Sequence, residues 1–105
     1  MQNDYIEIDG KDYRIEFNWN TISKFITLSG RQLIEAEKIA SLPAEDITLF
    51  IHCALVEGCR LDGEKFPFTV DEVGGMMDIA DIPVLFAIFS DQMAAKKTNI
   101  KAKKK

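Results

Sequence analysis

The sequence predicts an α+β fold that is mostly helical, with an N-terminal β-hairpin packed on a bundle of about four to five helices. Residues 5–17 alternate apolar and polar side chains around an Asp-Gly pair, which is typical of a hairpin. Residues 47–56 and 82–89 are the two most apolar runs, and their apolar residues recur at helical spacing. Neither run reaches the roughly 18 to 20 apolar residues that a membrane span needs, so both are expected in the core of one small domain.

The hairpin is expected to present one apolar face. Strands over residues 5–8 and 13–17 would be joined by a turn at Asp9 and Gly10. An isolated two-stranded ribbon is marginal in water, so this one must either pack on the helices or pair its edge with another chain. Alternation assigns to the buried face Ile6, Ile8, Tyr13, Ile15 and Phe17.

Two helices are expected between the hairpin and the first proline. Asn18 or Asn20 can cap the first helix by accepting backbone N–H bonds, and Gly30 suits a left-handed stop. A second helix is expected over residues 31–40. The apolar stripe of the first helix would hold Trp19, Ile22, Phe25 and Ile26, and that of the second Leu33, Ile34 and Ile39.

The central helix is expected over residues 43–57. Pro43 suits its first turn, where a missing N–H costs nothing, and Gly58 suits a left-handed stop after it. Residues 58–68 would then form a loop or a short ribbon. The expected core side of this helix consists of Ile47, Phe50, Ile51, Ala54 and Leu55.

Two more helices are expected in the C-terminal third. Thr69 and Glu72 have the spacing of a capping box, which predicts a helix start. Asp81 is expected to cap the last helix, which would end near Ala95. Its apolar face would hold Ile82, Leu85, Phe86, Phe89 and Met93.

Charge divides the chain into two parts. Residues 1–95 hold all 17 acidic residues against seven basic ones, whereas residues 96–105 hold six lysines and no acid. We therefore expect a single globular domain over residues 1–95 and a basic, disordered tail over residues 96–105, because like charges repel and little apolar surface is available to bury. The N-terminal residues are polar and acidic, which argues against a targeting sequence.

No motif predicts catalysis, a cofactor or a metal ion. His52 is the only histidine, and no HxxxH or CxxC pair supplies further ligands, so we expect a packed or partly exposed structural residue. Cys53 is expected to be buried and Cys59 more exposed, both as reduced thiols of a cytoplasmic protein. Because a glycine-rich phosphate loop and an activated nucleophile are also missing from the sequence, we predict that the protein is not an enzyme.

Large, adaptable apolar side chains predict a partner-binding surface. Methionine and phenylalanine near loops suit surfaces that repack around a bound protein. The alternative is that most of these residues belong to the core. The predicted partner-binding residues are Phe66, Phe68, Met76, Met77, Phe89 and Met93.

The order of elements and three short motifs carry a family resemblance. YIEIDGKDYRIEFN runs into NTISKFITLSG, followed by LPAEDITLFIHCALVEG and FTVDEVGGMMD. This arrangement resembles the small tail assembly chaperones of long-tailed bacteriophages and prophages, which open with I-x-I-x-G-K-x-Y-x-I/L-x-F-N and later show T-x-E-E-V-G. Residues 6–18 and 69–74 carry these motifs. A third match covers residues 54–58, where the family commonly has Gly-Leu in place of Ala54-Leu55.

The resemblance implies a binding function in the cytoplasm of a bacterial host cell. A chaperone of this family transiently binds the tape measure protein, a very long helical protein, and keeps it soluble until tail tube protein polymerises around it. The chain would therefore bind the tape measure protein and possibly the tail tube protein. A small acidic domain with an apolar groove suits this task, because long unpaired amphipathic helices aggregate.

Two other function classes stay open. The first is a small regulatory or nucleic-acid-associated module that acts through its lysine tail. The tail carries no aromatic residue to stack on bases, and the acidic body would repel nucleic acid, so we expect no nucleic-acid partner. The second is a structural virion or tail component that self-associates through the edge of its hairpin. We expect no membrane partner for any of these functions.

Overall fold

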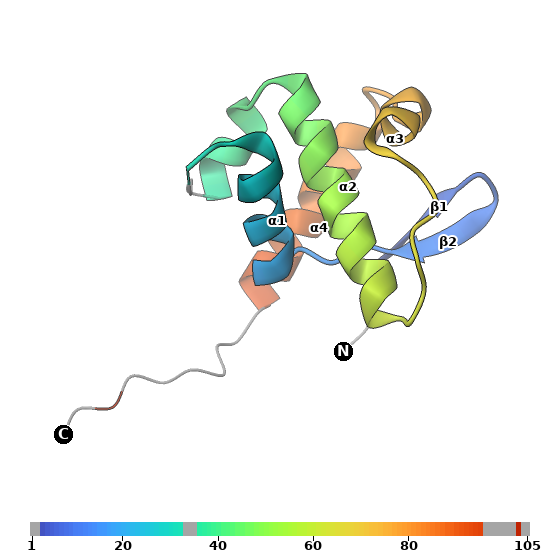
Figure 1. Ribbon diagram of the computed structural model, residues 1–105, viewed down its shortest axis with the longest axis horizontal. Coiled ribbons are helices and arrows are strands. Elements are labelled where there is room, and N and C mark those ends of the chain that lie inside the picture. Colours follow the sequence, from blue (N-terminus) through green and yellow to red (C-terminus); the bar gives the residue numbers. More distant parts are fainter. Residues whose placement is uncertain (1–2, 33–35, 96–102, 104–105) are drawn as a thin grey trace.

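The computed structural model describes residues 3–32, 36–95 and 103. The chain forms a hairpin of β1 (Tyr5–Ile8) and β2 (Lys11–Arg14), followed by α1 (Trp19–Ser29), a 3₁₀ helix η1 (Ala36–Ser41), α2 (Ala44–Leu61), α3 (Val70–Met76) and α4 (Asp81–Ala95) (Figure 1). The prediction of a mostly helical α+β fold with an N-terminal hairpin is confirmed. The predicted tail over residues 96–105 lies outside the described residues, apart from Lys103.

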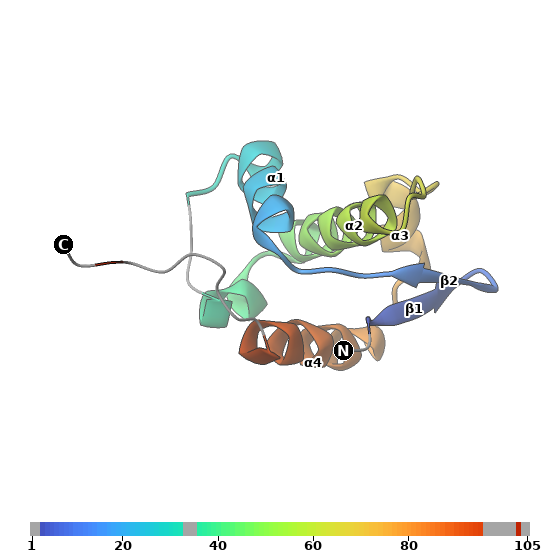
Figure 2. The ribbon, with the colours of Figure 1, turned by 90° about the horizontal axis from the view of Figure 1, so that it is seen from below.

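The hairpin and the chain that follows it form a middle layer. Figure 2 shows them between α4 on one side and α1 and α2 on the other. Asp9 and Gly10 have φ values of 53° and 83°, the left-handed pair that a two-residue hairpin turn requires, so the predicted turn is confirmed. Ile6 lies opposite Tyr13, and both side chains face the core as predicted.

The second strand lies closer to the turn than predicted: β2 begins at Lys11 and ends at Arg14, and residues 15–17 leave the hairpin and enter the helical layers. The Ile15 N–H still donates to the Asp4 carbonyl at 3.0 Å, but the Glu16 N–H donates to the carbonyl of Ala54 in α2 at 3.1 Å. Ile15 and Phe17 are fully buried. The extended segment 14–17 is therefore a core element seated on α2 rather than the end of a strand.

Gly58 does not end the central helix, contrary to our prediction. It stays helical inside α2, and a Cβ atom at this position would lie 2.0 Å from the Arg14 carbonyl oxygen. Glycine is needed there for the close approach of segment 14–17 and not for a left-handed conformation. The left-handed residue is Gly63, with φ of 74°, which follows the end of α2.

Four phenylalanine rings form the centre of the core. The Phe50 ring in α2 lies 5.2 Å from those of Phe17 and Phe25 and 5.5 Å from that of Phe89, measured between centroids. All four residues are buried. Such pairs contribute about 0.5–1.5 kcal/mol beyond the burial of their area, so Phe50 joins three separate segments of the chain.

Both predicted ends of α1 are confirmed, but Trp19 is not part of its buried stripe. The Asn18 side chain accepts from the Thr21 N–H, and Gly30 adopts φ of 74°. Thr21 and Phe25 are the buried residues of α1, whereas Trp19 is 65% exposed. Two residues correspond to about 200° of helix rotation, so the face that buries Thr21 turns Trp19 toward solvent.

Of the remaining helices, α3 begins as predicted, whereas η1 and α4 differ from prediction at their starts. Where a helix was predicted over residues 31–40, the structure has the 3₁₀ helix η1, which begins at Ala36. Leu33 and Ile34 of the predicted apolar stripe lie outside the described residues. Thr69 and Glu72 form the predicted capping box. Asp81 lies within the first turn of α4, where its carboxylate accepts from the Asp78 N–H at 2.8 Å.

No single helix among the described residues is both long and apolar enough to cross a membrane, and α3 with α4 meets that test only as a pair bent by 118°.

Candidate functional site

An apolar groove opens between β1, α3 and α4. Its volume is about 350 Å³, within the range of roughly 300–1,000 Å³ that binding pockets occupy. Ile51 and Leu55 of α2 form its floor and are almost completely buried. Apolar side chains of the other three elements form its walls, including Ile8, Val73 and Ile88. The groove can therefore receive apolar side chains without rearrangement of the core.

One edge of β1 faces this groove. All four residues of Tyr5–Ile8 line it, as expected when a strand presents its edge rather than one face. The bond from Ile15 to Asp4 and the pairing with β2 direct the peptide groups of Asp4, Ile6 and Ile8 toward the second strand. Antiparallel alternation directs those of Tyr5 and Glu7 to the groove, where no described residue pairs with them.

The charged side chains around the groove are acidic. Glu7 and Asp81 are its charged lining residues. Residues 66–95, which include α3 and α4, hold five acidic residues and no lysine or arginine. Both basic residues of the hairpin are engaged, because Arg14 pairs with Asp62 at 3.0 Å and Lys11 with Glu64 at 3.7 Å. The groove therefore combines an apolar floor with a negative rim.

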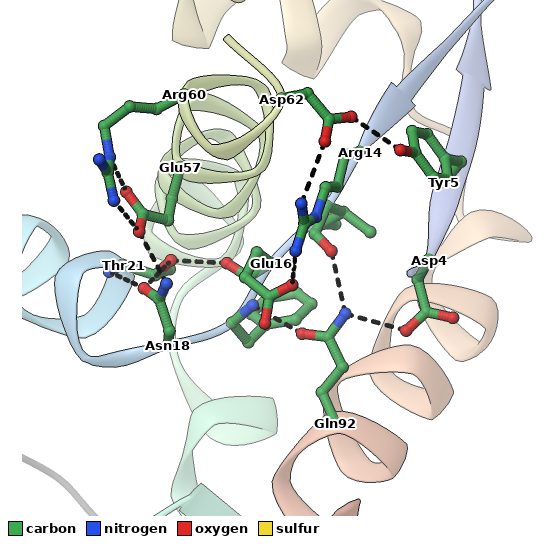
Figure 3. A network of polar contacts seen from close by, with 12 residues as sticks. Asp4, Tyr5, Arg14, Glu16, Asn18, Thr21, Glu57, Arg60, Asp62 and Gln92 are labelled. Atoms are coloured by element: carbon green, nitrogen blue, oxygen red, sulfur yellow. Dashed lines mark hydrogen bonds and ion pairs between the residues drawn. The ribbon is translucent and has the colours of Figure 1, made fainter. Parts of the chain in front are cut away.

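The hairpin is held beside α2 by a polar cluster at its far edge. The Tyr5 hydroxyl donates to one oxygen of Asp62 at 2.8 Å, and the Arg14 guanidinium donates to the other at 3.0 Å (Figure 3). These two bonds, the one from Tyr5 first, lower the pKa of the Asp62 carboxyl. The cluster joins both strands to the end of α2 and so fixes the free edge of β1 opposite α4.

Only two of the six predicted partner-binding residues line the groove. Met76 is 41% exposed and Met77 is half-buried, and both contribute to its walls. Phe66 and Phe89 are buried, so the structure assigns them to the core and not to a surface. The burial follows from their ring contacts, which the sequence pattern does not show.

The other two predicted residues lie away from the groove. The half-buried Phe68 packs edge-on against Tyr13 and Phe66 at centroid distances of 6.0 and 5.6 Å. Met93 is half-buried at a separate gap of about 50 Å³, which is lined by residues of α1, η1, α2 and α4. Neither residue contributes to the groove lining.

Sequence reasoning missed the contributions of β1 and α4 to the groove. Val84 of α4 lines it and is 58% exposed, and Ile79 in the turn before α4 is 87% exposed. The signal was present in the composition of α4, because its only charged residues are Asp81 and Asp91. A surface helix normally carries a polar outer face, so an apolar outer face indicates an uncovered surface.

A second depression, of about 470 Å³, lies between α1, α2 and α3. It is more open than the groove, and its lining includes Glu45, Asp46 and Asp71 beside Leu28. It presents no strand edge among the described residues. The groove is thus the better receptor for an apolar segment, although it is the smaller space.

Among the described residues, Glu57 has a strongly lowered carboxyl pKa, and its role is structural. Its buried carboxylate accepts from Asn18 at 2.7 Å and from Arg60 at 2.8 and 2.9 Å (Figure 3). It also accepts from Asn20 at 3.1 Å. These bonds, chiefly the one from Arg60, hold the pKa of Glu57 at about 2 although burial opposes them. The bonds from Asn18 and Asn20 join the start of α1 to α2, whereas those from Arg60 lie within α2. The carboxylate is thus engaged in structural bonds.

Gln92 satisfies the backbone of segment 14–17. Its amide oxygen accepts from the Phe17 N–H at 2.7 Å, and its amide nitrogen donates to the Ile15 carbonyl and to the Asp4 carboxylate, both at 2.9 Å (Figure 3). The side chain thereby takes the place of a neighbouring strand. This is how α4 is held against the middle layer.

The cysteines and the histidine are placed as packing residues. Cys59 is buried, contrary to our prediction, because α2 continues past Gly58 and carries it into the core. Burial raises the pKa of both thiols, that of Cys53 to about 11. His52 bonds the Phe68 carbonyl at 2.8 Å. Within the described residues, no three His, Cys, Asp or Glu side chains converge on a position where a metal ion could bind.

No family model, curated protein or solved structure matches this chain. The resemblance to tail assembly chaperones therefore rests only on the short sequence motifs in the hairpin, in α2 and at the start of α3.

Proposed function

We propose that this chain is a phage or prophage tail assembly chaperone that transiently binds the tape measure protein in the groove between β1, α3 and α4. The observation that carries the proposal is an apolar groove of about 350 Å³ in the surface of a small acidic domain. The motif resemblance supplies the identity of the partner. The groove supplies a place for one of its apolar segments.

The chemistry of the groove suits a reversible, protective contact. Met76 and Met77 give its walls flexible side chains that can repack around different apolar residues. The net charge of −10 over residues 1–95 would keep a complex dispersed while an apolar segment is covered. Binding through one groove covers a short segment, so several copies would bind along a long partner.

Co-expression with the tape measure protein of the same phage or prophage tests the proposal. We expect this chain to increase the soluble fraction of the partner and to be captured with it. Val84→Glu places a charge in the groove and should abolish both effects. Leu28→Glu is the matched control, because Leu28 is 57% exposed against 58% for Val84 and lies in the other depression. Equal loss in both variants, or no effect of the native chain, would refute the proposal.

One alternative has a structural observation in its favour. The free edge of β1 could pair with another copy of this chain, as a structural tail component would require. Oligomers that form with increasing concentration in the absence of any partner would support it. The tail-dependent nucleic-acid function stays a prediction, because its lysines lie outside the described residues except Lys103.

A further inference from the structure

We infer that the groove binds its partner as an extended, basic segment that adds a third strand to the free edge of β1. This inference deepens the proposed function and rests on it for the location of the site. It states the conformation and the charge of the bound segment, which neither the resemblance nor the apolar lining determines. A helix laid in the groove is the competing arrangement.

The strand edge favours an extended segment. The outward peptide groups of Tyr5 and Glu7 face the groove without a partner among the described residues. A helix satisfies its own backbone and would cover these groups without bonding them, whereas an added strand would bond them. The hairpin has only two strands, and a third would also stabilise it.

The protein already contains an arrangement of this kind. Segment 14–17 lies between α2 and α4, and its outward peptide groups are bonded by the Gln92 side chain and the Ala54 carbonyl. A segment beside β1 would lie between that strand and α4. Its alternate side chains would enter the apolar floor over Ile51 and Leu55.

Charge selects a basic partner over a second copy of this chain. A copy would bring its own Asp4, Glu7 and Asp9 against the same three acids, and like charges in directly opposed strands destabilise the pair. Lysine or arginine at the alternate positions of an incoming segment would instead face Glu7 and Asp81. The occupant is thus a partner segment with alternating apolar and basic residues.

Selection from a library of random short peptides displayed on phage tests the inference with the full-length chain as bait. We expect enriched peptides with apolar residues at every second position and lysine or arginine between them. Enrichment of apolar residues at spacings of three and four would show a helix and overturn the inference. Acidic peptides, or no enrichment at all, would overturn it as well.

Two proline variants test whether the bound segment forms backbone hydrogen bonds with β1, one variant on the groove edge of the hairpin and one on its other edge. Glu7 and Asp12 lie directly opposite each other in the hairpin, and the N–H groups of both point away from the ladder. Proline is tolerated at such edge positions, so both variants should fold. Glu7→Pro should weaken binding of a selected peptide about tenfold or more, which corresponds to loss of a backbone bond in the complex. Asp12→Pro should leave binding unchanged.

Further measurements with the same peptide distinguish the contribution of charge to binding from that of the backbone hydrogen bonds. Glu7→Gln should weaken binding, increasingly so at low salt, whereas Asp12→Asn should not. Hydrogen exchange of the Tyr5 and Glu7 amides, followed by NMR, should slow in the complex. Unprotected amides, or equal effects of the paired variants, would refute strand addition.

Failure of the inference can be told apart from failure of the proposed function. If selected peptides add to β1 but the tape measure protein does not bind, the proposed partner is wrong and the strand-addition mode is retained. If Val84→Glu abolishes binding of the tape measure protein but Glu7→Pro does not affect it, the proposed partner is retained and strand addition is wrong.

Discussion

Two neighbouring stripes of α2 bury apolar residues in different ways. One stripe, Phe50, Ala54 and Gly58, is covered by segment 14–17 and by the phenylalanines around it. The adjacent stripe, Ile51 and Leu55, forms the floor of the groove. The side chains of both stripes are apolar, so hydrophobicity does not distinguish the closed side from the open one.

The two sides differ in the hydrogen bonding of the peptide groups that lie over them. On the closed side, the N–H groups of Ile15, Glu16 and Phe17 donate to Asp4, Ala54 and Gln92, respectively. On the groove side, the outward groups of Tyr5 and Glu7 find no partner among the described residues. A segment can cover an apolar helix face only where its buried peptide groups are hydrogen-bonded. On the open side, the unpaired peptide groups of β1 can form such bonds with a segment of another protein.

Truncation of Phe50 gives the largest expected contrast between the two sides. Phe50→Ala removes a ring that contacts three other rings and should lower the free energy of unfolding by about 3 to 5 kcal/mol. Met76→Ala on the groove wall, 41% exposed, should cost less than about 0.5 kcal/mol. Urea unfolding measures both. A cost below 1 kcal/mol for Phe50→Ala would mean that the closed side is not the core of the molecule.

A methyl group at Gly58 should separate segment 14–17 from α2. Its Cβ would lie 2.0 Å from a backbone oxygen that cannot rotate away, so Gly58→Ala should cost about 3 kcal/mol despite the better helix propensity of alanine. Gly75→Ala in α3 is the control, since a Cβ there meets nothing within 4 Å. The control should gain roughly 0.5–1 kcal/mol. If both variants are stabilised in thermal or urea unfolding, the close approach at Gly58 is wrong.

Acid should weaken the closed side through Glu57. Its folded pKa of about 2 lies below the ordinary value of 4.5, so its stabilising contribution is complete above about pH 4.5 and is lost as the pH falls toward 2. Glu57→Gln should cost about 2 kcal/mol at neutral pH. The difference in free energy of unfolding between the variant and the native chain should shrink across that window. A difference that stays constant from neutral pH to pH 2 would contradict the pKa shift.

Much of the local structure could be predicted because it depends on neighbouring residues. The turn at Asp9 and Gly10, the Asn18 cap, the Gly30 stop and the Thr69 capping box each follow from a few consecutive side chains. The fold class follows from the same patterns. The binding surface could not be found this way, because it depends on which side chains meet across the fold.

The misplaced residues show this dependence. Phe66 and Met76 are both large apolar residues close to loops, yet one is buried against Tyr13 and the other is exposed on the groove wall. Gly58 has the sequence context of a helix stop and functions as a contact point for a distant segment. Sequence spacing carries no information on such contacts between residues far apart in the chain.

The sequence by itself determined the hairpin, its turn, the helix caps and the apolar stripes, because those depend on interactions within a few residues. The tertiary structure decided which stripe the chain covers with its own backbone and which it leaves open. That choice rests on the absence of a side chain at Gly58 and on the amide of Gln92, which together let segment 14–17 lie on α2 with the N–H groups of residues 15–17 bonded. No second segment of that kind lies beside β1 in the described part of the chain, and the groove is the result.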